Sequence, residues 1–117
     1  MRIVIDLDGT ICEIRKPNQD YANVKPKMAA VRAIRTLKRE GHSIIIYTAR
    51  HMKTCDGNVG AVIERVGSTT LKWLRQHGVQ YDEIHFGKPW GEIYVDDQAM
   101  PPMWGAVLAK ARKKVKI

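Results

Sequence analysis

Short apolar runs alternate with longer helical patterns along this chain. β-Branched and other apolar side chains dominate residues 2–7 and 43–47, and a weaker run of the same kind covers residues 82–86. Continuous apolar runs of this length are typical of strands buried in a parallel sheet. A fourth run, residues 92–95, predicts a further strand that ends at an acidic pair.

Helical patterns fill the stretches between these strands. Residues 26–41 begin with a proline suited to a first helical turn, repeat apolar side chains at helical spacing and end at a glycine. Residues 63–78 show a similar spacing that a Gly-Ser pair interrupts, and residues 103–114 predict a C-terminal helix. This order predicts an α/β fold in which helices flank a central parallel sheet.

Two polar stretches fit neither pattern. Residues 9–25 have no sustained period and contain proline and asparagine, which predicts an irregular excursion. Residues 51–60 are polar and contain glycine, so we expect an exposed loop there. Both stretches directly follow predicted strands and would therefore flank a site at the strand ends.

Length and charge narrow the class of protein. A chain of 117 residues suits one domain, residues 1–117, and its apolar runs are shorter than the roughly 20 residues that a membrane span needs. No apolar leader opens the sequence, so we expect a cytoplasmic protein without membrane association. The net charge of +8 favours an anionic partner, but it suits nucleic acid and a small phosphorylated substrate equally.

Polar side chains follow each predicted strand at the point where it ends. They are Asp6 and Asp8, Thr48, Lys88, and Asp96 with Asp97. Because ligands of open parallel sheets bind beyond the carboxyl ends of the strands, we expect these side chains to converge. Four carboxylates in one crevice repel one another unless a cation offsets their charge. Oxygen ligands without a His/Cys cluster favour Mg²⁺.

The acidic pair after the first strand offers a mechanism. A carboxylate can attack phosphorus and divide one transfer into two easier ones, which makes Asp6 the candidate nucleophile. Asp8, turned back by Gly9, is the candidate acid/base. Thr48 and Lys88 would stabilise the charge of the phosphoryl group. The sequence therefore predicts a phosphatase site.

These residues resemble the four motifs of the haloacid dehalogenase superfamily of phosphohydrolases. The motifs occur in order, as DLDGT at 6–10, a threonine after the second strand, a lysine before a proline, and the acidic pair. The resemblance implies a Rossmann-like sheet, with Asp6 as nucleophile and Asp8 as acid/base. It also implies a metal site for Mg²⁺ formed by Asp6, Asp8, Asp96 and Asp97, and a phosphoryl site formed by Thr48 and Lys88.

The spacing of the motifs leaves no room for the cap domain that most of these proteins carry. The chain also resembles the small phosphatases of bacterial capsule and surface-polysaccharide synthesis, through YTARHM at 47–52, GKPW at 87–90 and IYVDD at 93–97. This implies a sugar phosphate as substrate and a homo-oligomer, a dimer or tetramer, in which a neighbouring subunit covers the open site. The candidates for substrate contacts are Leu7, Gly9, Thr10, Ala49, Arg50 and His51.

Two other functions stay open at this point. An uncapped site on a basic chain also suits a phosphatase of nucleic-acid ends, which predicts salt-sensitive binding to oligonucleotides. A domain that binds phosphate without catalysis would be attractive if one of the four motifs had decayed, and none has.

Overall fold

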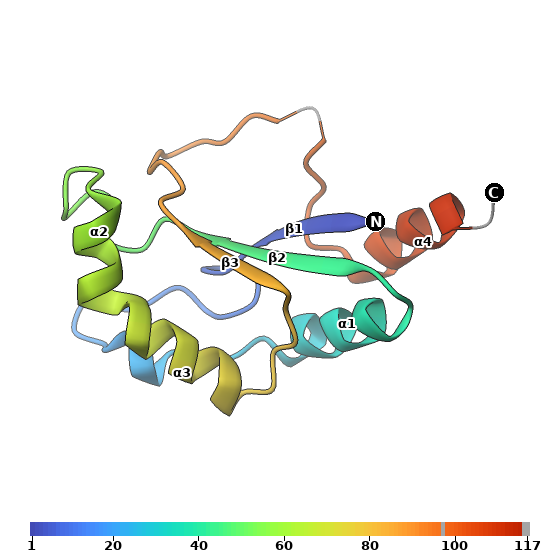
Figure 1. Ribbon diagram of the computed structural model, residues 1–117, viewed down its shortest axis with the longest axis horizontal. Helices are drawn as coiled ribbons and strands as arrows, with labels where there is room; N and C mark the ends of the chain where they lie inside the picture. The colour runs from blue at the N-terminus through green and yellow to red at the C-terminus, as the bar shows by residue number, and fades with distance from the viewer. Residues whose placement is uncertain (97, 116–117) are drawn as a thin grey trace.

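A small parallel sheet lies at the centre of the fold. The computed structural model describes residues 1–96 and 98–115. Strands β1 (Arg2–Asp6), β2 (Ser43–Thr48) and β3 (Glu83–Phe86) lie in that order and are all parallel (Figure 1). The three strands expected at residues 2–7, 43–47 and 82–86 are confirmed.

The helices follow the predicted pattern. They are α1 (Met28–Arg39), α2 (Val59–Val62), the π-helical stretch η2 (Ile63–Gly67), α3 (Ser68–Gln76) and α4 (Trp104–Val115). The expected interruption of the middle helix takes the form of η2, a π-bulge that joins α2 to α3 without breaking the run. Among the described residues, no helix is long and apolar enough to cross a membrane.

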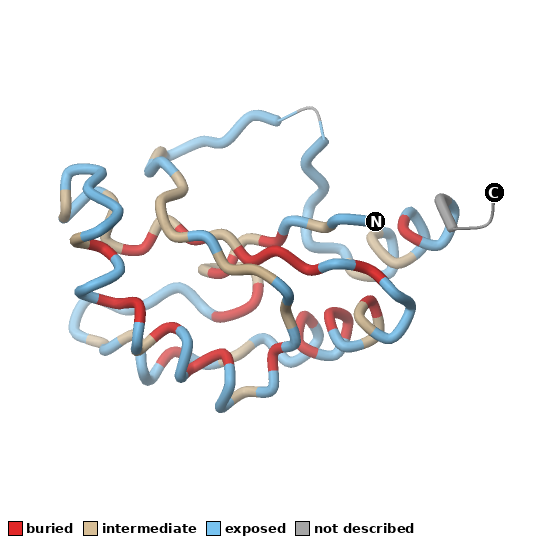
Figure 2. Tube along the Cα trace, in the orientation of Figure 1, coloured by how far each residue is buried: buried red, intermediate tan, exposed pale blue. Residues whose placement is uncertain are grey.

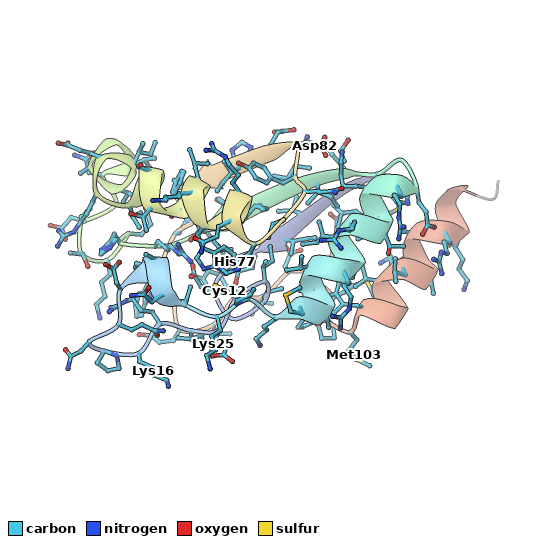
Figure 3. All side chains as sticks on the ribbon, turned by 90° about the horizontal axis from the view of Figure 1, so that it is seen from below. Cys12, Lys16, Lys25, His77, Asp82 and Met103 are labelled. Carbon is cyan, nitrogen blue, oxygen red and sulfur yellow. The ribbon has the colours of Figure 1, made fainter. Side chains whose placement is uncertain are left out.

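One apolar core lies between the sheet and the helices. Ile5, Ile44 and Ile46 face this core from the strands, and Leu37 and Trp73 reach it from α1 and α3. Figure 2 shows the buried positions gathered on β2 and on the inner sides of these helices. Seen from below in Figure 3, α1 lies between α3 and α4 across the same side of the sheet. The periodic apolar residues of the sequence therefore form the interior.

The excursion after β1 is irregular, as expected. It contains a single turn of 3₁₀ helix, η1 (Tyr21–Asn23), and isolated bridges that join Cys12 to Asp8 and to Pro26. The indole N–H of Trp73 donates to the carbonyl of Val24 at 2.8 Å, which ties the excursion to α3.

The predicted strand over residues 92–95 is wrong. Within the described residues this segment pairs with no strand, and Ile93 and Val95 are 80% and 94% exposed. It belongs to the connection between β3 and α4, of which residues 87–96 and 98–103 are described (Figure 1). The connection before this segment is too short for a further parallel strand. Only Pro89, Trp90 and Gly91 separate Lys88 from the segment, whereas a parallel strand needs a crossover of about a dozen residues.

Candidate active site

The carboxyl ends of the strands gather three predicted site residues. Asp6 ends β1, Thr48 ends β2, and Lys88 follows β3 by two residues. Lys88 Nζ lies 3.4 Å from Asp6 Oδ1, and the Lys88 N–H donates to the Thr48 carbonyl at 3.1 Å. The parallel sheet therefore places a carboxylate and an ammonium group in contact at its carboxyl edge.

A tight turn after β1 brings Asp8 back to the same edge. Gly9 has a φ of 83°, in the left-handed region that favours glycine, and its N–H donates to the Cys12 carbonyl at 2.8 Å. The Leu7 carbonyl accepts from the N–H groups of Ile11 and Cys12. This hydrogen-bonded turn orients Asp8 toward the end of β2.

Both carboxylate oxygens of Asp8 are held by donors. The Thr48 hydroxyl donates to Oδ2 at 2.9 Å, and Arg50 Nε donates to Oδ1 at 2.8 Å. Thr48 is fully buried, and its oxygen also accepts the Arg50 backbone N–H at 3.1 Å. In this structure the Thr48 hydroxyl therefore orients Asp8.

Arg50 is enclosed by its partners. Its side chain has no exposed surface, its Nη1 donates to the Thr70 hydroxyl at 3.1 Å, and its guanidinium stacks on Tyr21 with 4.2 Å between Cζ and the ring centroid. Sequence reasoning did not identify Tyr21 or Thr70, because neither belongs to a motif. A buried guanidinium bonded to Asp8 is a positioning group for that carboxylate.

Lys88 lies between Asp6 and an aromatic ring. Its Nζ is 4.0 Å from the centroid of the Tyr94 ring, an attractive cation–π contact. The Tyr94 hydroxyl donates to the Pro89 carbonyl at 2.7 Å and accepts the Gly91 N–H at 3.0 Å. Tyr94 was also missed by the sequence analysis, which placed it within the predicted strand over residues 92–95 and gave it no part in the site.

Burial and charge act in opposite directions on Asp6. Burial raises the pKa of this carboxyl above its ordinary value, and the ammonium group of Lys88 offsets part of that rise. The neighbouring charge of Asp8 raises the same pKa further. At His51, burial and the nearby guanidinium groups of Arg65 and Arg15 lower the pKa of the imidazole below its ordinary value.

A pocket of about 280 Å³ opens beside Asp8. Its lining residues are Asp8, Arg15, Tyr21, Ala49, Arg50, His51, Lys53, Thr54 and Trp90. The lining therefore includes Ala49, Arg50 and His51 from the predicted substrate contacts, while Leu7, Gly9 and Thr10 lie outside it. Lys53 Nζ lies 4.6 Å from the centroid of the Trp90 ring. Basic and aromatic side chains thus surround an acidic group.

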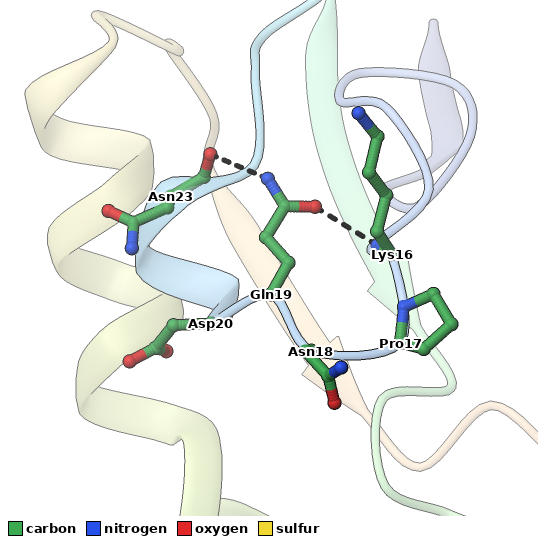
Figure 4. Close-up of a pocket in the computed structure, with 6 residues that line it drawn as sticks. All are labelled: Lys16, Pro17, Asn18, Gln19, Asp20 and Asn23. Carbon is green, nitrogen blue, oxygen red and sulfur yellow. Dashed lines mark hydrogen bonds between the residues drawn. The ribbon is translucent and has the colours of Figure 1, made fainter.

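A larger hollow of about 730 Å³ lies in the excursion before η1 (Figure 4). It is lined by Lys16, Pro17, Asn18, Gln19, Asp20 and Asn23. The Gln19 side chain crosses it, accepting from the Lys16 N–H and donating to the Asn23 carbonyl, both at 3.0 Å. This hollow is lined by none of the predicted site residues, whereas the smaller pocket is lined by Asp8, so we place the candidate site at the smaller pocket.

Two of the predicted acidic residues are placed where they could bind a divalent metal ion. Asp6 and Asp8 supply two carboxylates, and Mg²⁺ in proteins is commonly bound by one or two carboxylates together with substrate phosphate. Within residues 1–96 and 98–115, no group of three or more His, Cys, Asp or Glu side chains is placed to hold a metal. Asp96 therefore does not join the pair, and Asp97 lies outside the described residues.

Two solved structures share the fold. A chain of the Pnkp1/Rnl/Hen1 complex is 19% identical with a TM-score of 0.55, over 82% of this chain and 30% of that one. The D,D-heptose 1,7-bisphosphate phosphatase of B. bronchiseptica, complexed with magnesium and phosphate, is 19% identical with a TM-score of 0.51, over 97% of this chain and 63% of that one. These likenesses show the fold alone, an α/β domain whose parallel sheet is flanked by helices, as the sequence predicted.

A nearer relative shows the family. A Vibrio cholerae protein of known crystal structure, an MCSG target, is 37% identical with a TM-score of 0.85, over 96% of this chain and 94% of that one. The chain belongs to the same family as this Vibrio cholerae protein. No family model matches the sequence, and no curated protein matches it.

Proposed function

We propose that this protein is a Mg²⁺-dependent phosphomonoester hydrolase that acts through an aspartyl-phosphate on Asp6. The observation that carries this proposal is the arrangement of two carboxylates in different surroundings. Asp6 is paired with Lys88 and partly exposed, while Asp8 is held by Thr48 and Arg50. A nucleophile and an acid/base need such a division, because one must attack while the other exchanges a proton.

In the first step an Asp6 oxygen attacks phosphorus, and the bond from phosphorus to the leaving oxygen breaks. The leaving oxygen takes the proton of the Asp8 carboxyl group. Lys88 Nζ balances negative charge on the transferred group. A Mg²⁺ ion bound by Asp6 and Asp8 would add positive charge next to the phosphoryl oxygens.

In the second step water attacks the phosphorus of the aspartyl-phosphate and gives its proton to Asp8. The bond between phosphorus and the Asp6 oxygen breaks, so phosphate leaves and the carboxylate is restored. The two donors on Asp8 keep this group at one position through both proton transfers. Thr48 can reverse its hydroxyl hydrogen bond when Asp8 carries the proton, because a hydroxyl group both donates and accepts.

The pocket supports a small phosphorylated substrate. Its volume of about 280 Å³ is at the low end for ligand sites, and Arg15 and Lys53 supply positive charge at its rim. Trp90 offers an aromatic surface beside them. A sugar phosphate of capsule or surface-polysaccharide synthesis matches this chemistry and the resemblance of the motifs. The bisphosphate sugar in the name of the B. bronchiseptica enzyme belongs to the same class of compound.

A phosphatase of nucleic-acid ends is the second candidate. The net charge of +8 favours it, since a polyanion would bind a basic chain beyond the pocket itself. A phosphate-binding domain without catalysis is the third, and it would bind substrate without turnover.

The test is phosphate release with and without Mg²⁺ from sugar phosphates, nucleotides, and 3′- or 5′-phosphorylated oligonucleotides. Asp6→Asn is the variant, and Asp56→Asn is a matched control, because it makes the same change at an exposed residue that does not line the pocket. Selective turnover of sugar phosphates, lost in Asp6→Asn, supports the proposal. Preferred turnover of oligonucleotides would support the second candidate, and binding without turnover would support the third.

A further inference from the structure

The outer edge of β1 has no strand beside it in the described sheet. The strand order is β1-β2-β3, so the N–H and C=O groups on one side of β1 are left without ladder partners there. Val4, at the centre of β1, is 59% exposed. An exposed edge of this kind is a template for pairing with another strand.

The same chain contains a segment with the properties of the missing strand. Residues 92–96 have the strand-forming sequence EIYVD, yet Ile93 and Val95 are the most exposed large apolar side chains of the described residues, at 80% and 94%. Burial of apolar side chains is the main driving force for association. The segment and the β1 edge both have five residues, so their lengths match.

The segment cannot reach this edge in parallel within its own chain. The Lys88 N–H is fixed to the Thr48 carbonyl at the end of β2, and only three residues separate Lys88 from Glu92. The four steps from the Cα of Lys88 to the Cα of Glu92 span at most about 14 Å. To begin beside Arg2, Glu92 would have to cross about 10 Å of sheet width and about 16 Å of strand length, a distance of about 19 Å.

A second copy of the chain is free of this limit. We propose that residues 92–96 of a partner chain pair in parallel with the outer edge of β1, and that the exchange is reciprocal in a two-fold dimer. The register that places the partner's Asp96 beside Asp6 also places the partner's Glu92 beside Arg2. Arg2 already pairs with Glu83, and its guanidinium has further donors for a second carboxylate.

The alternation of side chains agrees with this register. Ile5 faces the core from β1 and Ile3 packs against it, while Val4 points to the open face. In the paired strand, the partner's Ile93 and the partner's Val95 would lie on the same side as Ile3 and Ile5. The two most exposed apolar side chains would thereby become buried, because successive residues of a strand face opposite sides.

The pairing would also complete the acidic site. Asp96 does not join Asp6 and Asp8 within one chain, but the end of the exchanged strand would bring the partner's Asp96 next to Asp6. This part rests on the proposed function. The exchange has two identifiable losses at Tyr94: its ring must leave Lys88 Nζ, and its hydroxyl must leave the carbonyl of Pro89 and the N–H of Gly91. Both backbone groups belong to the exposed connection, so water can replace the Tyr94 hydroxyl.

Cross-linking tests the exchange without reference to activity. Arg2→Cys and Glu92→Cys are made in separate full-length chains with Cys55→Ser, and the two are co-expressed and oxidised. Parallel neighbours are about 4.8 Å apart, within the range of a disulfide. A covalent product of about twice 13.3 kDa supports the proposal. The matched pair Arg2→Cys with Asp96→Cys reports the antiparallel register. A stronger product from that pair, or a monomer by light scattering, overturns it.

Mixed dimers test whether Asp96 acts across the interface. Asp6→Asn and Asp96→Asn are each expected to be inactive, and the two chains are co-expressed with different tags. A mixed dimer would contain one intact site, because Asp6 and Asp96 of that site come from different chains. Random assortment then restores about a quarter of wild-type turnover, since half of the dimers are mixed and each has one of two sites intact.

The two experiments separate the two proposals. Cross-linking in the parallel register without phosphatase activity in the wild type would overturn the proposed function and leave the exchange standing. An active wild type whose mixed dimers stay inactive would overturn the role of the partner's Asp96. An active wild type that is monomeric would overturn the exchange alone.

Discussion

Arg50 Nε donates to Asp8 Oδ1 at 2.8 Å, and the side chain of this arginine has no exposed surface. A guanidinium withdrawn from water needs a negative partner, and Asp8 supplies it. Asp8 itself keeps 26% of its side chain exposed and lines the pocket. The interior of the protein therefore determines the position of a carboxylate that faces the pocket.

Arg50→Ala is expected to lower the free energy of unfolding by about 2–4 kcal/mol, because it leaves the Asp8 and Thr70 contacts without a partner. Arg50→Lys keeps the charge but loses the planar fork, so kcat should fall while KM changes little. Denaturant unfolding and steady-state kinetics measure the two effects.

Arg15→Ala is the control for Arg50. Arg15 also stacks on Tyr21, with 5.1 Å between Cζ and the ring centroid, but it is exposed. Its removal should change stability by less than about 0.5 kcal/mol. Equal stability of the two alanine variants would contradict the positioning role of Arg50.

Lys88→Ala should reduce kcat by about 10²- to 10³-fold, since Lys88 supplies the positive charge in contact with Asp6. Lys53→Ala removes the same type of side chain from the exposed rim of the pocket and should mainly raise KM. Phosphate-release kinetics on both variants distinguish the roles. A pure KM effect in Lys88→Ala would show that Lys88 only binds substrate.

Asp6→Asn should be more stable than the wild type at neutral pH. The pKa of Asp6 is raised by burial, so the folded state binds this proton more tightly than the unfolded chain does. The free energy of unfolding therefore falls as pH rises from the unfolded pKa, about 3.9, through the folded value. Asparagine does not ionise, so the free energy of unfolding of Asp6→Asn lacks this fall. The difference in stability between the variant and the wild type should therefore vanish at low pH, where Asp6 is protonated in both the folded and the unfolded state.

Thermal unfolding of both proteins between about pH 3 and pH 7 measures this difference, and the comparison cancels the titration of other carboxylates. Lower stability of Asp6→Asn across the whole range would show instead that the ion pair with Lys88 outweighs the burial of Asp6.

Gly87→Ala should displace the backbone immediately before Lys88. Gly87 has a φ of 103°, and an added Cβ would lie 2.9 Å from Val59 Cγ2. We expect a loss of about 1–3 kcal/mol together with reduced kcat. Gly105→Ala is the matched control, because a Cβ there meets nothing within 4 Å and α4 should gain about 0.5–1 kcal/mol. Chemical denaturation compares them, and a stable, fully active Gly87→Ala would contradict this account.

Much of the fold could be predicted from local patterns. The strands that end at Asp6 and Thr48 are continuous apolar runs, and the spacing of Val31, Ile34 and Leu37 defines the buried face of α1. Parallel strands carry their following residues to one edge, so the meeting of Asp6 with Lys88 could be expected as well. The regular spacing of apolar residues was sufficient for these predictions.

The surroundings of each site residue depended on contacts between distant segments. Arg50 resembles an exposed loop residue in sequence, and only the packing of Tyr21 and Thr70 around it makes it a buried partner of Asp8. Residues 92–95 have the composition of a strand, but a strand also needs an available edge and a connection long enough to reach it. The sequence by itself determined which segments favour strand or helix and which residues follow them, because those properties are local. Only the tertiary structure decided which donors hold Asp8 and whether Asp96 reaches Asp6, because both depend on distances across the fold.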